Sequence, residues 1–97
     1  MTDEELRASW PELAALVGEL RPEHSALAQR LVDSVQYAST SGEIYNGVGN
    51  ALWQNKALRK SLSRSARASW EAVINDIDRA YGMPGPMRWI MRMLRRI

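Results

Sequence analysis

The sequence predicts an all-α fold, a small single-domain bundle of four to five helices that spans residues 1–97. Two observations favour this fold. Apolar residues recur at intervals of three or four, which is the period of a helix with one buried face, and alternation typical of strands is missing. A chain of 97 residues with 45% hydrophobic side chains is also long enough for one domain with one core.

Residues 2–38 are predicted to form an acidic helical hairpin. Thr2 with Glu5 has the spacing of a capping box, and Ser9 with Glu12 repeats it, so we expect a short N-terminal turn before the first main helix. Two antiparallel helices should follow at 10–20 and 22–38, because the connection between them is short. Their expected buried stripes are Leu13, Leu16, Val17 and Leu20 in the first helix, and Leu27, Leu31, Val35 and Ala38 in the second.

The middle of the chain, residues 39–50, is predicted to be a loop. The stretch Ser39–Gly42 has the composition of a loop, and Gly47-Val48-Gly49 is interpreted as a tight turn. Residues 51–82 are then predicted to form a basic helical region. Trp70 in this region and Trp10 in the first half of the chain are both expected to lie in the core. The pattern leaves open whether this region is one helix or two, with a break near Ser63–Ser65 in the second case.

The C-terminal segment, residues 86–97, is predicted to be a short, basic and amphipathic helix. Its apolar face contains Met87, Ile90 and Leu94, and arginines occupy much of the remaining surface. Both a place in the core and a role as a docking arm fit this pattern.

Charge is divided unequally along the chain. Up to Glu43 there are eight acidic and three basic residues, whereas from Ile44 onward there are three acidic and ten basic ones. This division indicates an interaction with nucleic acid, an anionic membrane or an acidic protein, unless the two halves neutralise each other. Spacings of four, four and three place Lys56, Lys60, Arg64 and Arg67 on one helix face. The candidate partner-binding residues are Trp53, Lys56, Arg59, Lys60, Arg64, Arg67, Arg88, Trp89, Arg92, Arg95 and Arg96.

The sequence predicts no catalytic, cofactor or metal site, and therefore no enzyme. There is no cysteine, and His24, the single histidine, does not face its neighbour Ser25 on a helix. Asp76 and Asp78 are interpreted as solvated charges. We expect neither a signal peptide nor a transmembrane helix, because the N-terminus is acidic and no apolar stretch approaches the roughly 20 residues that span a bilayer. A cysteine-free chain suits the reducing cytoplasm.

The stretch Tyr45-Asn46-Gly47-Val48-Gly49-Asn50, which follows the acidic hairpin, resembles small bacterial helical proteins, some of them similar to immunity proteins of toxin systems. The leading hypothesis is a non-catalytic protein-binding module, such as an immunity or antitoxin-like inhibitor that neutralises a partner through an acidic surface of that partner. The alternative is a nucleic-acid-binding protein that uses the basic helix face. A second alternative is binding to a membrane surface, or self-association into a homo-oligomer, through residues 86–97.

Overall fold

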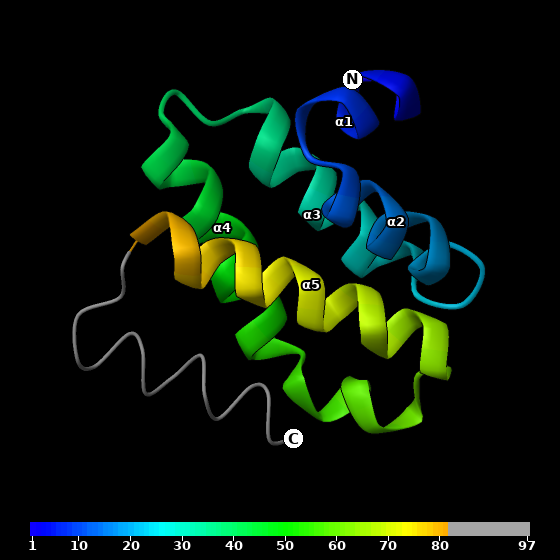
Figure 1. Ribbon diagram of the computed structural model, residues 1–97. Helices are drawn as coiled ribbons and strands as arrows, with labels where there is room; N and C mark the ends of the chain where they lie inside the picture. The colour runs from blue at the N-terminus through cyan, green and yellow to red at the C-terminus, as the bar shows by residue number, and fades with distance from the viewer. Residues whose placement is uncertain (82–97) are drawn as a thin grey trace.

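The computed structural model describes residues 1–81, and all regular structure in this part of the chain is helical (Figure 1). The all-α prediction is therefore confirmed for these residues. Five α-helices and one 3₁₀ helix occur here: α1 (Asp3–Ser9), α2 (Pro11–Leu20), α3 (Ser25–Gln36), α4 (Ser41–Gln54), the 3₁₀ helix η1 (Lys56–Ser61) and α5 (Arg64–Tyr81). The helix predicted at 86–97 lies outside the described residues.

Helix α1 begins with the predicted capping box. The Thr2 hydroxyl accepts a hydrogen bond from the backbone N–H of Glu5, and the Glu5 carboxylate accepts one from the backbone N–H of Thr2. The pKa of the Glu5 carboxyl is lower than its ordinary value. The hydrogen bond from the Thr2 backbone has the largest effect, and a hydrogen bond with the Thr2 side chain has the next largest. The second predicted capping box is wrong, because Trp10 precedes α2 and makes no side-chain capping bond.

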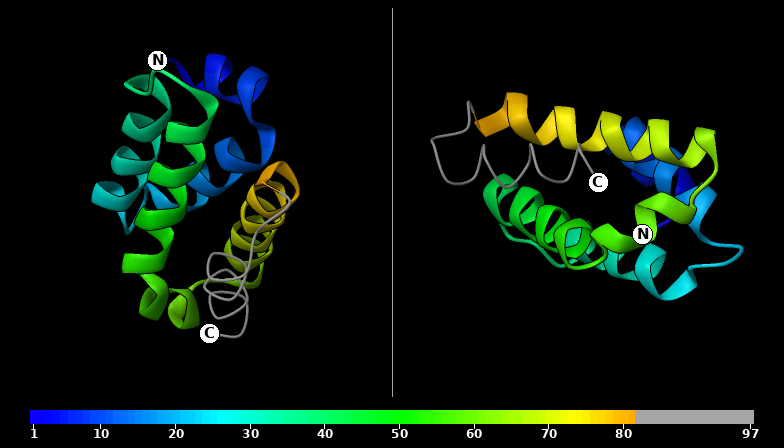
Figure 2. Two further views of the ribbon diagram at one scale, coloured as in Figure 1. Left: turned by 90° about the vertical axis from the view of Figure 1, so that its left-hand side faces the viewer. Right: turned by 90° about the horizontal axis from the view of Figure 1, so that it is seen from below.

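Helix α2 is the element against which α1, α3 and α5 all pack. Figure 2 shows α3 and α4 side by side in one layer, with α5 in a second layer. The predicted stripe of α2 is confirmed, since Leu13, Leu16, Val17 and Leu20 are all buried. Helix α3 begins at Ser25, later than predicted, because the residues that follow Arg21 form a turn before the chain reverses direction (Figure 1).

The loop predicted at 39–50 is wrong, because most of this stretch belongs to α4. Thr40 caps the helix by accepting a hydrogen bond from the N–H of Glu43 at 3.1 Å, and the Glu43 carboxylate accepts one from the N–H of Ser39 at 3.0 Å. Gly47 lies inside α4 where the helix approaches α3 closely. A Cβ atom at Gly47 would be 3.0 Å from the Cβ of Ser34. Glycine at this position serves helix packing instead of the predicted turn.

Alanine substitutions at Gly18 and Gly47 are expected to have different effects on stability. At Gly18 no atom lies within 4 Å of the added Cβ, so the higher helix propensity of alanine should raise the free energy of unfolding by about 0.5–1 kcal/mol. At Gly47 the contact with Ser34 opposes this gain, and we expect a smaller or reversed change. Urea unfolding of both variants, and of Gly47→Ala combined with Ser34→Gly, measures the difference. A Gly47→Ala effect that Ser34→Gly does not improve would contradict this explanation.

The basic helical region predicted at 51–82 is divided into the end of α4, the 3₁₀ helix η1 and α5. Asn55 separates α4 from η1, and its side-chain amide donates a hydrogen bond to the carbonyl oxygen of Ala51 at 2.8 Å. Ser63 precedes α5 and accepts a hydrogen bond from the N–H of Ala66 at 3.1 Å. The break expected near Ser63–Ser65 is therefore present, and a second break at Asn55 was not predicted.

A hydrophobic core connects all five α-helices. Trp10 and Trp70 both belong to it, as predicted, and Trp70 is completely buried. Ala66, Val73 and Ile77 of α5 are buried with Trp70, at the three- and four-residue spacing of a helix with one buried face. This core fixes the positions of the two surfaces described below.

Candidate functional site

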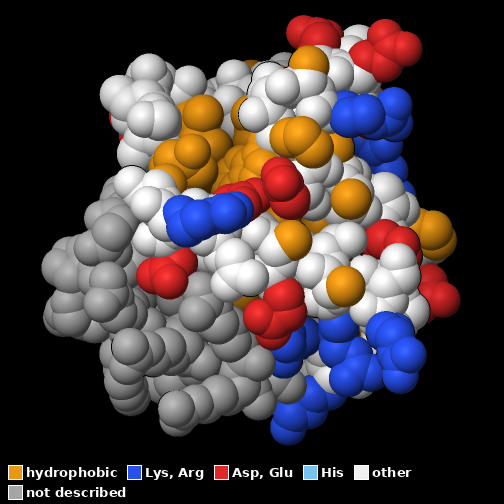
Figure 3. Space-filling view, in the orientation of Figure 1, with side chains coloured by type: hydrophobic (Ala, Val, Ile, Leu, Met, Phe, Trp, Pro, Cys, Tyr) orange, Lys and Arg blue, Asp and Glu red, His pale blue; other side chains and the backbone are white. Residues whose placement is uncertain are grey.

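The basic residues between positions 56 and 67 do not share one helix face, so this prediction is wrong. Lys56 and Lys60 belong to the 3₁₀ helix η1, which has about three residues per turn, whereas Arg64 and Arg67 lie at the start of α5. The predicted spacing requires one continuous α-helix, which the chain does not form. Basic side chains nevertheless gather where η1 meets α5 (Figure 3). We call this surface the basic corner; it contains Lys56, Arg59, Lys60, Arg64 and Arg67.

The bases of this corner differ in burial and in pairing. The Arg59 side chain is 12% exposed and forms an ion pair with Glu71 of α5. Burial, and secondly the nearby charge of Arg67, lowers the pKa of the Arg59 guanidinium. Lys60, Arg64 and Arg67 are exposed, and within residues 1–81 no acidic side chain pairs with any of them. The corner thus has an anchored arginine and three exposed cations without acidic partners.

Trp53 lies beside the basic corner at the end of α4. Its side chain is half-buried and packs against the core. The ammonium nitrogen of Lys56 is 3.7 Å from the centroid of the Trp53 ring, which is a cation–π arrangement. The remaining candidates, Arg88, Trp89, Arg92, Arg95 and Arg96, lie outside the described residues.

The acidic and basic halves do not neutralise each other through ion pairs in the described part of the chain. Arg21 pairs with Asp3 within the acidic half, and the other two pairs, Arg59–Glu71 and Arg79–Asp76, lie within the basic half. A hydrogen bond of 2.6 Å does cross the division, from the Ser65 hydroxyl to the Glu19 carboxylate. Among residues 1–81, no ion pair therefore joins the acidic half to the basic half.

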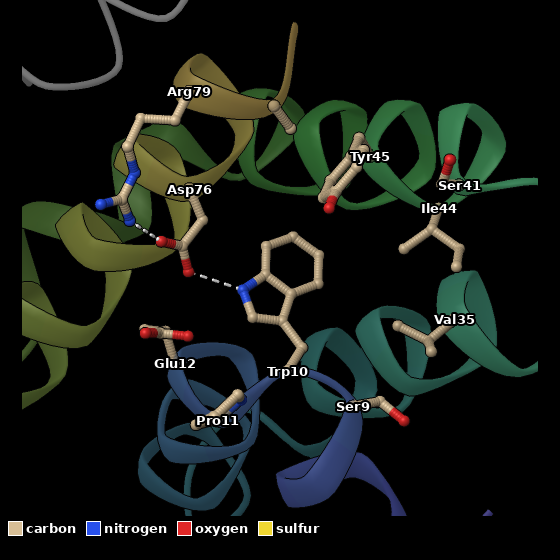
Figure 4. Close-up of a pocket in the computed structure, with 11 residues that line it drawn as sticks. Ser9, Trp10, Pro11, Glu12, Val35, Ser41, Ile44, Tyr45, Asp76 and Arg79 are labelled. Carbon is tan, nitrogen blue, oxygen red and sulfur yellow. Dashed lines mark hydrogen bonds and ion pairs between the residues drawn. The ribbon is translucent and has the colours of Figure 1, made fainter.

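A second surface, which the sequence did not reveal, is a cleft of about 440 Å³ between the beginnings of α2 and α4 and the end of α5. We call it the Trp10 cleft. Figure 3 shows a hollow with hydrophobic side chains at its bottom and charged side chains at its edge, and Figure 4 shows the residues around it. The lining includes Trp10, Glu12, Val35, Ile44, Tyr45 and Asp76.

Asp76 is held firmly at this cleft. The indole N–H of Trp10 donates a hydrogen bond to Oδ2 of Asp76 at 2.7 Å, and Arg79 forms an ion pair with Oδ1 (Figure 4). The rings of Trp10 and Tyr45 meet edge to face, with centroids 5.3 Å apart. Because the Asp76 side chain is only 15% exposed, its interpretation as a solvated charge is wrong.

Residues 1–81 contain neither a metal-binding cluster nor a membrane-spanning helix. No group of three or more His, Cys, Asp or Glu side chains is placed to hold a metal ion in this range. None of its helices combines the length and the hydrophobicity needed to cross a membrane.

The fold and these surfaces define a helical protein with two distinct surfaces. The basic corner has three exposed cations that pair with no acidic side chain in residues 1–81, and the Trp10 cleft has mixed polarity. Comparison of the chain with protein-family models, with curated proteins and with solved structures gives no match in any of the three.

Proposed function

We propose that this protein is a non-catalytic binding module whose basic corner docks onto an acidic surface of a partner protein. The observation that carries the proposal is the group of three exposed cations, Lys60, Arg64 and Arg67, which no acidic side chain in residues 1–81 neutralises. Such a group attracts an acidic surface over several ångströms and accelerates association with it.

The side chains that hold the basic corner in place are already ordered before a partner binds, and this favours binding. The ion pair between Arg59 and Glu71 connects η1 to α5, and the buried side chain of Leu62 anchors the segment between them. Lys56 is held over the ring of Trp53. A surface that is ordered before binding loses less conformational entropy when a partner arrives.

An acidic protein suits this arrangement better than nucleic acid does. A basic row along one α-helix would follow a phosphate backbone, but the change from 3₁₀ helix to α-helix between Lys60 and Arg64 removes that row. A cation held over a half-buried tryptophan, as Lys56 is over Trp53, is more typical of a protein interface. Inhibition of a toxin, as by an immunity or antitoxin-like protein, is the form of this proposal that the sequence resemblance favours.

Charge reversal at the basic corner should weaken partner binding strongly. We expect Lys60→Glu combined with Arg64→Glu to lower the affinity for the partner by at least about tenfold, mainly through slower association. The matched control is Arg7→Glu with Arg30→Glu, which reverses two exposed bases on α1 and α3. Pull-down from the native host with mass spectrometry identifies the partner, and surface plasmon resonance then compares the variants.

The same proteins distinguish the proposal from its alternative. At physiological salt we expect the wild type to bind a DNA or RNA duplex of about 20 base pairs with a Kd that is micromolar or weaker. Nanomolar duplex binding, lost in the corner variant and retained in the control, would replace the proposed function with nucleic-acid binding. Equal partner affinity of the corner and control variants would exclude the basic corner as the interface.

A further inference from the structure

We propose that the Trp10 cleft binds a small organic cation, an ammonium group on an apolar body. The ammonium group takes the place at Asp76 that the guanidinium of Arg79 occupies, and the apolar body lies among Trp10, Tyr45 and Ile44. This site is separate from the basic corner and does not depend on the function proposed above.

The size and lining of the cleft fit such a ligand. A volume of about 440 Å³ lies within the range of small-molecule sites, which is roughly 300–1,000 Å³. Val35 and Ile44 supply apolar surface from α3 and α4, and Trp10 and Tyr45 add two aromatic rings at a fixed mutual angle. Aromatic rings offer apolar contact and also attract cations through their faces.

The charge of the cleft selects a cation. Asp76 is positioned before any ligand arrives, because the Trp10 indole fixes one carboxylate oxygen at 2.7 Å while the other oxygen is paired with Arg79. Glu12, half-buried on the same cleft, forms no ion pair within the described chain and adds negative charge. An anionic ligand would meet both carboxylates. A metal ion is less suitable than an organic cation, because no third carboxylate or histidine in residues 1–81 completes a ligand set.

Without a ligand, the guanidinium of Arg79 occupies the cation position at Asp76, and a ligand can displace it. Its side chain is 75% exposed, in contrast to the 15% of Asp76. An ion pair with so exposed an arginine contributes little, because water competes for the guanidinium and the long side chain must be ordered. A ligand that brings its own cation and also buries the exposed apolar surface of Ile44 and Tyr45 can displace Arg79. The structure therefore predicts opposite effects of substitutions at the two partners of this ion pair.

Nuclear magnetic resonance of the isotope-labelled full chain tests the site. The probe is phenethylammonium, and the readout is the indole N–H signal of Trp10, assigned by its loss in Trp10→Phe. We expect a saturable shift with phenethylammonium, binding at least about tenfold weaker for the neutral 2-phenylethanol, and no saturable shift with the anionic 3-phenylpropionate. Equal affinity for the neutral compound, or no saturable shift with the cation, would overturn the proposal.

Two variants provide the sharper test. Asp76→Asn retains an oxygen that can accept the Trp10 N–H, yet it should weaken phenethylammonium binding by about tenfold or more because the charge is lost. Arg79→Gln should strengthen binding severalfold because the competing cation is removed. Arg30→Gln, an exposed arginine of α3 that does not line the cleft, is the matched control and should change nothing. Weaker binding in Arg79→Gln would refute the displacement, and this variant decides the matter if Asp76→Asn fails to fold.

Discussion

Replacement of Trp70 by alanine is expected to lower the free energy of unfolding by about 3–5 kcal/mol. Trp70 lies in the middle of α5 with 0% of its surface exposed, and it belongs to the core that joins this helix to the rest of the molecule. Removal of the indole leaves a large cavity that rigid neighbouring helices can fill only in part. Urea unfolding followed by circular dichroism measures the loss.

Trp70→Phe is the control that separates packing from hydrogen bonding. The indole N–H of Trp70 is buried and has no acceptor in the described part of the chain. Phenylalanine removes this unsatisfied donor while it retains an aromatic ring, so we expect a loss of only about 1–2 kcal/mol. A loss below about 1 kcal/mol in Trp70→Ala would mean that α5 is not held by this side chain.

Glu71→Gln is expected to lower the free energy of unfolding by about 2–3 kcal/mol. The guanidinium of Arg59 stays protonated even though burial lowers its pKa, because arginine has a very high ordinary pKa. Without Glu71 this largely buried cation loses its ion-pair partner, and its Nε atom already lacks a hydrogen-bond acceptor within residues 1–81. The expected loss in the free energy of unfolding is smaller than for a fully buried ion pair, because the Glu71 side chain is 31% exposed. Urea unfolding at neutral pH is the measurement.

The matched variant for this prediction is Arg59→Met, which replaces the cation by an apolar side chain of similar length. Combined with Glu71→Gln, it should be more stable than Glu71→Gln alone, because no unpaired charge remains buried. Equal stability of Glu71→Gln and the wild type would show that the ion pair contributes nothing to the fold.

The helices with one simple buried face could be predicted from the sequence. In α2, Leu13, Leu16 and Val17 follow the helical period because they all face the core, and in α5 Trp70 and Ile77 do the same. In such helices the spacing of the apolar residues indicates directly which side chains pack in the core. Their ends were less well defined, as the late start of α3 at Ser25 shows.

Helix α4 was missed because its composition is that of a loop. Gly47 and Gly49 have low helix propensity, but Gly47 allows a close approach to Ser34, which only the tertiary structure reveals. One local signal could have found the helix. Thr40 and Glu43 have the three-residue spacing of a capping box and stand before an apolar series that includes Ile44 and Val48.

The candidate surfaces were predicted in part. Residue types identified the basic corner, but the change to a 3₁₀ helix at Lys56 altered its geometry in a way that spacing alone did not indicate. The Trp10 cleft was not predictable, because Trp10, Tyr45 and Asp76 come from distant parts of the chain. No local sequence pattern predicts a hydrogen bond between an indole and a carboxylate that are so far apart in the sequence.

The packing of α5 on α2 also affects the kinetics of folding. Contacts of α1 with α2, of α2 with α3, and of α3 with α4 join neighbours along the chain, so each closes a short loop. The contact between α2 and α5 joins segments separated by all the residues from Arg21 to Ser63, and its loop-closure entropy is correspondingly larger. Docking of α5 is therefore the most non-local step of the folding reaction among residues 1–81. The Trp10 cleft needs this step, because Asp76 reaches Trp10 only from α5.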